Sequence, residues 1–292
     1  MSFWDALFGV VFEPGFFSSA PVHTAMIVGG GAAVVSGVVG VFTVMREQSF
    51  AGHALAEVSS AGGSASFLFG INPLAGFLTV AALAAAGMEV LQIRRARERD
   101  LMTGIVLGAG LGVAALFLYL DVTSTSTTGA AITVMFGSMF SISPAIIPLA
   151  LTTGVVTLFV VALLYRPLLL STLDPELARV RGVPVLATGI LHLVVVGLAV
   201  SLSAITVGAI LSTALLIGPA AIGLRLARRP ATAVLVSVLI AVGMTWSGIL
   251  LAYDSYYWIP GHSWPVSFFV VTLIFVAYLA AFRSARTRLG EH

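Results

Sequence analysis

The sequence contains no cysteine and no lysine, and only 9% of its residues are charged. Without cysteine the chain can form no disulfide, iron–sulfur cluster, thiolate zinc site or cysteine nucleophile. Without lysine it can form no Schiff base, and it has no Walker-type phosphate loop. The metalloprotease pattern H-E-x-x-H and the hydrolase pattern G-x-S-x-G are also missing. We therefore expect a protein that is not an enzyme and does not itself hydrolyse nucleotide through that loop.

Apolar residues dominate instead: 59% of the 292 residues are hydrophobic. Several apolar runs reach the roughly 20 residues that a helix needs to cross the hydrocarbon core of a bilayer. This composition predicts an all-α fold, a polytopic membrane helix bundle of about nine transmembrane segments. The expected spans are 20–44, 52–70, 72–93, 101–120, 145–165, 184–201, 204–226, 231–252 and 264–283.

The arginines predict how the bundle is oriented. All 14 basic residues are arginine, and they fall in alternate connections between the expected spans. Because cytoplasmic loops are enriched in basic residues, this pattern places the N-terminus outside and the C-terminus inside. Residues 130–143 are too short to span, so we expect a re-entrant segment or half-helix there, buried against protein.

The expected domain organisation is simple. Residues 1–19 lack the basic start of a signal peptide and are rich in aromatic residues, which is typical of an interfacial segment. Residues 20–283 form a single transmembrane domain, and residues 284–292 form a cytoplasmic tail. On the outer side, Asp121, Asp254 and His262 are interpreted as solvated loop residues, with receipt of a metal ion or docking of a partner protein as the alternative. The tyrosines and tryptophans of 253–265 are interpreted as an interfacial belt.

His53 and Glu57 are the most unusual residues of the sequence, because each is an ionisable group inside an apolar span. Such groups cost several kcal/mol at membrane depth and usually have a partner and a function. Their spacing of four residues places both side chains on one helical face, where an imidazole nitrogen and a carboxylate can approach one divalent cation. The structural alternative is a His–Glu hydrogen bond that joins two helices.

Other small or polar residues lie near this pair or deep in a span. Gly52, Gly62 and Gly63 surround the pair, and the last two would permit bending or unwinding of the helix beside it. Glycine is also frequent in 104–112, where we expect close helix contacts. His192 lies deep in the sixth span and is a further candidate metal ligand; a hydrogen bond to a neighbouring helix is the alternative.

The connection 166–183 predicts a short helix outside the membrane. Asp174 is a good N-cap, Pro175 suits the first helical position, and Gly182 with Pro184 stops the helix. Such a helix could contact a partner protein or could be an ordinary linker between spans.

Taken in order, these stretches resemble the permease subunits of bacterial ABC importers for zinc and manganese, from about Gly37 to Phe282. The first match is the stretch 49–57, where His53 and Glu57 occupy the family's acid and histidine positions with the two residue types exchanged. Further matches are Thr103-Gly104-Ile105-Val106-Leu107, Phe136-Gly137-Ser138, Asp174-Pro175-Glu176-Leu177-Ala178, Val207-Gly208-Ala209-Ile210-Leu211 and the stretch 214–220.

The resemblance implies a permease of the bacterial cytoplasmic membrane that imports Zn²⁺ or Mn²⁺ as a transported substrate, with no permanently bound cofactor. It implies a second permease copy, two copies of a separate ATPase, an extracytoplasmic metal-binding protein and surrounding lipids as partners; no nucleic acid is expected. The 174–181 helix would be the coupling helix in the ATPase cleft. The residues assigned to coupling are Asp174, Pro175, Glu176, Leu177, Ala178 and Arg179.

Two other functions fit parts of the sequence. A permease of the same broad fold could carry an iron chelate, haem or cobalamin, but a large ligand would not need an inward-facing His–Glu pair. A secondary cation transporter could use Glu57 as a proton carrier without any ATPase, but it would not need the capped helix at 174–181.

Overall fold

The computed structural model describes residues 15–92, 99–125, 129–258 and 264–289. Most of the expected N-terminal segment, residues 1–14, lies outside these ranges. The described part is helical, and a long helix occupies each of the nine expected spans. These helices are α2 (Ala20–Met45), α3 (Ser49–Phe69), α4 (Pro73–Gln92), α5 (Arg99–Thr125), α7 (Ile147–Leu173), α9 (Val185–Val207), α10 (Ala209–Leu226), α11 (Pro230–Trp258) and α12 (Val266–Leu289).

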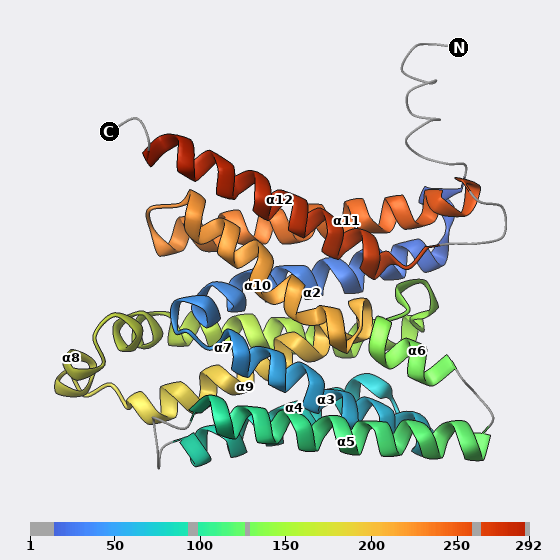
Figure 1. Cartoon of the computed structure of the whole chain (residues 1–292), viewed down its shortest axis with the longest axis horizontal. Coiled ribbons are helices and arrows are strands. Elements are labelled where there is room, and N and C mark those ends of the chain that lie inside the picture. Colours follow the sequence, from blue (N-terminus) through green and yellow to red (C-terminus); the bar gives the residue numbers. More distant parts are fainter. Residues whose placement is uncertain (1–14, 93–98, 126–128, 259–263, 290–292) are drawn as a thin grey trace, which may run out of the picture.

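Seven of the described helices are long and apolar enough to cross a membrane, and Pro73–Met88 of α4 is a shorter apolar stretch. Nine crossings therefore remain a prediction. The arrangement agrees with the expected alternation of sides, because the short helix α8 (Pro175–Val180) and the end of α12 lie at one end of the bundle, and α2 starts at the other (Figure 1).

The helices form layers (Figure 1). Helices α3, α4 and α5 lie on one side and α11 and α12 on the other, with α2, α7 and α9 between them. Two buried serines connect the layers: Ser203 on α9 bonds Ser36 on α2 at 2.7 Å, and Ser201 on α9 donates to the carbonyl of Phe77 on α4 at 3.1 Å. Satisfying hydroxyls in this way suits helices that are enclosed by other helices.

Glycine and proline mark several helix ends. Helix α3 ends at Gly70, which has a φ of 67°, and α4 begins at Pro73 after Asn72, whose side chain accepts a bond from the Leu74 amide at 3.0 Å. Helices α9 and α10 are separated by Gly208 alone, with φ 93° and ψ 156°. Because only glycine adopts that conformation readily, Gly208 fixes where α9 ends and α10 begins.

Residues 130–143 do not form a long helix. Helix α6 (Gly129–Phe136) is one short element, followed by the 3-10 turns η3 (Met139–Ser141) and η4 (Pro144–Ile146) that lead into α7. Eight residues rise only about 12 Å, too little to span the hydrocarbon core. The segment is therefore a short helix followed by turns, while its re-entrant topology stays a prediction.

The interpretation as solvated loop residues is wrong for Asp121 and Asp254, while His262 lies outside the described residues. Asp121 and Asp254 are buried, at 2% and 6% exposure, instead of lying in solvated loops. The reason is that α5 and α11 run several residues beyond the expected spans and carry these residues into packed helix ends. Helix α12 similarly continues through most of the expected tail, to Leu289.

Candidate metal site and coupling helix

Helix α3 carries the candidate metal ligands close to its start. The turn from α2 is tight because Glu47 adopts a left-handed φ of 57°. His53 follows one turn into the helix and is half-buried, and Glu57 lies one turn further and is only 5% exposed. Their spacing of four residues along α3 puts the two side chains on the same face of the helix. The sequence therefore places an imidazole and a carboxylate together on an enclosed helical face.

The imidazole of His53 has a partner that the sequence did not reveal. Its Nδ1 atom lies 3.0 Å from the hydroxyl oxygen of Thr213 on α10. The two residues are 160 positions apart, so no local spacing could have paired them. This hydrogen bond differs from the predicted structural alternative, in which the histidine would bond the glutamate to join two helices.

Within the described ranges, no third histidine or acidic side chain joins the pair. Among the residues that the structure describes, no group of three or more histidine, aspartate and glutamate side chains could hold a metal ion. A tetrahedral Zn²⁺ site needs four ligands and a Mn²⁺ shell needs more. The two donors of His53 and Glu57 are thus fewer than either metal needs, and their role as ligands stays a prediction.

His192 does not join this pair. It is 1% exposed in α9, and neither ring nitrogen has a hydrogen-bond partner among the described residues. Neither a metal group nor a bond to a neighbouring helix is formed there, so its role as a ligand stays a prediction.

The glycines beside the pair pack closely against other helices. A Cβ at Gly52 would lie 3.0 Å from a methyl group of Leu216 on α10. A Cβ at Gly62 would overlap the carbonyl of Gly76 on α4, and one at Gly63 would overlap the ring of Phe77. Helix α3 is continuous through these positions. Their contribution to bending stays a prediction, whereas their role in close packing is visible.

The predicted short helix is present as α8. Asp174 caps it by accepting a bond from the Leu177 amide at 2.8 Å, Pro175 is its first residue, and Gly182 follows with a φ of 77°. Ala178 is fully buried, while Leu177 and Val180 are exposed. The helix is therefore fixed to the bundle on one side and presents apolar groups on the other.

Arg46 connects the end of α7, just before α8, with the start of α3. Its guanidinium donates to the hydroxyls of Ser171 at 3.0 Å and Thr172 at 3.4 Å. Its Nε donates to the side-chain oxygen of Gln48 at 3.4 Å, immediately before α3. One arginine thus bonds both the end of α7, two residues before α8, and the residue that precedes α3.

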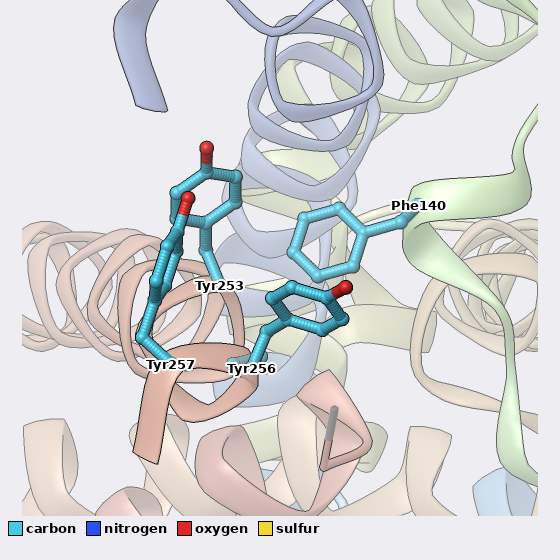
Figure 2. Close-up of a pocket in the computed structure, with 5 residues that line it drawn as sticks. Phe140, Tyr253, Tyr256 and Tyr257 are labelled. Atoms are coloured by element: carbon cyan, nitrogen blue, oxygen red, sulfur yellow. The ribbon is translucent and has the colours of Figure 1, made fainter. Parts of the chain in front are cut away.

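A separate pocket of about 280 Å³ lies near the end of α11, lined by Phe140, Ala252, Tyr253, Tyr256 and Tyr257 (Figure 2). In Figure 2 the rings of Tyr253 and Tyr257 stand on one side and face Phe140 and Tyr256 on the other. The lining is aromatic and contains no acidic or histidine side chain. This composition fits the predicted interfacial aromatic belt and gives the pocket no metal ligands.

Comparison with known proteins decides the family. The pattern of the ABC 3 transport family matches residues 19–282, nearly the whole chain. The chain belongs to this family. The match begins just before α2 and ends within α12, so it includes the His53–Glu57 pair, Thr213 and α8.

Relatives with described activities are similar over most of their length. The chain is 28% identical to the manganese import system permease protein ScaB of Streptococcus gordonii, over 79% of this chain and 80% of that protein. It is 26% identical to the high-affinity zinc uptake system membrane protein ZnuB of Haemophilus influenzae, over 79% and 88%.

The fold also has a solved counterpart. The structure of PsaBC from Streptococcus pneumoniae in complex with Fab contains a chain that matches with a TM-score of 0.79 at 22% identity, covering 92% of this chain and 93% of that one. Together with the seven long apolar helices, the family identifies a multi-pass membrane protein.

Proposed function

We propose that this protein is the membrane permease of an ATP-driven importer that carries a divalent transition metal, Mn²⁺ or Zn²⁺, across the bacterial cytoplasmic membrane. The observation that carries the proposal is the pair on α3. The imidazole of His53 has one nitrogen hydrogen-bonded to Thr213, and the buried carboxylate of Glu57 lies one turn away. Nitrogen and oxygen donors suit Zn²⁺ and are accepted by Mn²⁺, and the relatives named above carry these two metals.

The incomplete ligand set supports a dimer. A twofold axis near α3 would bring two imidazoles and two carboxylates together, which is enough for four-coordinate Zn²⁺ or for part of a Mn²⁺ shell. Ions would then pass between two permease copies. Because each copy holds only half of the site, separating the copies would also release the ion.

The energy would come from a separate ATPase, in two copies, that binds at α8. The exposed Leu177 and Val180 offer an apolar contact there, while the buried Ala178 keeps α8 attached to the bundle. Arg46 would carry a displacement of α8 to the first turn of α3, because it bonds both the end of α7 and Gln48. Alternating access follows if this displacement changes the distance between the two metal-binding helices. An extracytoplasmic binding protein would deliver the ion.

The test is uptake of radioactive Mn²⁺ and Zn²⁺ by proteoliposomes that contain the permease with its ATPase and binding protein. We expect His53→Ala and Glu57→Gln each to lower uptake by about 100-fold or more. Losing a ligand should cost at least as much as losing a residue that only orients a ligand. His192→Ala in the same series shows whether the ion path includes α9. His23→Ala is the matched control, because its Nε2 bonds the Phe17 carbonyl at 2.7 Å, far from α3 in the sequence.

Uptake of Mn²⁺ and uptake of Zn²⁺ are measured separately. The metal whose uptake the α3 variants lose is the substrate. Normal uptake by both α3 variants, in complexes that still assemble, would show that the pair is structural. Uptake that continues without ATP would identify a secondary transporter instead.

A further inference from the structure

The contact between α3 and α10 is the starting point. Thr213 is half-buried on α10, and its hydroxyl oxygen lies 3.0 Å from Nδ1 of His53. Serines and threonines in membrane helices commonly bond a carbonyl of their own helix, as the neighbouring Ser212 does with Ala209 at 2.8 Å. The hydroxyl of Thr213 instead contacts another helix, at His53. His53 is the one histidine that has an acidic residue, Glu57, one turn away.

The direction of this hydrogen bond decides what the imidazole can do. If Nδ1–H donates to the threonine oxygen, the proton is on Nδ1 and the lone pair of Nε2 is available for a metal ion. If the threonine O–H donates to Nδ1, the proton of the neutral ring is on Nε2, which then cannot bind metal. Histidines that bind metals usually donate their other N–H to an oxygen, which fixes the tautomer and the orientation of the ring.

The packing around Thr213 holds that oxygen in place. Leu216 lies one turn further on the same face of α10, and its carbonyl meets Gly40 on α2 so closely that a Cβ there would overlap it. The side chain of Leu216 also lies against Gly52, the residue before His53. Gly208 fixes the start of α10 little more than one turn before Thr213. The Leu216–Gly52 contact thus holds α10 close to the first turn of α3 beside the hydrogen bond, and the Gly40 contact holds the same part of α10 against α2.

We propose that Thr213 is a positioning residue for the transported ion: its oxygen accepts the Nδ1–H of His53 and presents Nε2 to the metal. This inference rests on the proposed function, because it requires His53 to be a ligand. It adds a residue from α10 to a site whose ligands both lie on α3. Thr213 itself does not touch the ion.

The experiment compares variants of Thr213 in the reconstituted transporter, with KM for the metal ion and the maximal uptake rate measured separately. Thr213→Val keeps the shape of the side chain and replaces its hydroxyl with a methyl group. Thr213→Ala removes the hydroxyl and puts no methyl group in its place. We expect both to raise KM by about 10- to 100-fold, the usual effect of losing a residue that orients a metal ligand. Thr213→Ser restores the hydroxyl and should return KM to within about threefold of the wild type.

Ser212→Ala is the matched control, because it removes a neighbouring hydroxyl that bonds only within α10. Its KM should equal that of the wild type. A maximal rate that falls equally in all four variants, with KM unchanged, would overturn the proposal and show that Thr213 only supports packing.

His53→Ala measured in parallel separates this inference from the proposed function. If His53→Ala loses uptake while Thr213→Val keeps the wild-type KM, the site stands and the positioning role is wrong. If His53→Ala transports normally, the site itself is wrong, and any effect of Thr213→Val has another cause.

Discussion

Helices α3 and α5 pack against each other, yet α3 is largely buried whereas α5 exposes large apolar side chains. Helix α5 is apolar enough to count as a membrane span, and it exposes large side chains such as Leu101, Ile105 and Tyr119. Helix α3 is less apolar and is largely buried, with four fully buried serines that each bond a carbonyl of their own helix. A helix enclosed by protein can carry His53 and Glu57, whereas a helix facing lipid needs apolar residues.

The glycines of the two helices show the same contrast. Gly62 and Gly63 on α3 touch the backbone or side chains of α4 so closely that no Cβ fits. On α5, a Cβ added at Gly104, Gly108 or Gly112 would meet no other part of the described chain within 4 Å, and only Gly110 packs tightly, against Val58. Within one copy, the expectation that most of these glycines are packing positions is thus met at Gly62, Gly63 and Gly110, and not at the other three glycines of 104–112. Glycine frequency alone does not distinguish packed positions from open ones.

The largest effect is expected from Gly62→Ala on α3. The new Cβ would overlap the carbonyl of Gly76, and a backbone atom cannot move aside as a side chain can. Overpacking of this kind costs at least about 1–3 kcal/mol. The thermal unfolding midpoint of the purified permease should fall clearly. An unchanged midpoint would show that α3 and α4 are not held at this distance.

A smaller loss is expected from Gly110→Ala on α5. Its Cβ would lie 2.6 Å from a methyl group of Val58 and 2.8 Å from its Cα, so part of the overlap can be relieved by rotation of the side chain. We expect a cost of about 1 kcal/mol, at the low end for overpacking. Because Val58 follows Glu57, metal uptake should also fall. Wild-type stability together with wild-type uptake would contradict the α3–α5 contact.

The smallest effect, with the opposite sign, is expected from Gly108→Ala, two residues earlier on the same helix. Nothing described lies near its Cβ position, and alanine favours a helix over glycine by up to about 1 kcal/mol. The unfolding midpoint should stay the same or rise. A fall would show that another surface lies against this face of α5 and would remove the contrast with Gly62.

Much of the fold was predictable from the sequence, because its signals are local. Apolar runs placed the nine long helices, and Asp174 with Pro175 and Gly182 predicted α8. The spacing of His53 and Glu57 was enough to put both on one face of α3. Each of these features depends on residues within a turn or two of one another.

The remaining features depend on which helices become neighbours. Thr213 is one hydroxyl in an apolar helix, and nothing in its surroundings indicates a partner 160 residues away. The difference between Gly62 and Gly108 likewise depends on what lies opposite. The burial of Asp121 and Asp254 was missed because hydropathy marks where a span is apolar and not where its helix ends.

The contact between Gly62 and Gly76 has a mechanical consequence. Where two backbones meet without side chains between them, a displacement along the helices brings a bulkier neighbour into the contact. The contact therefore resists sliding of α3 against α4. At the boundary between α3 and α10, two different contacts join the helices: the hydrogen bond between His53 and Thr213 and the close approach of Leu216 to Gly52.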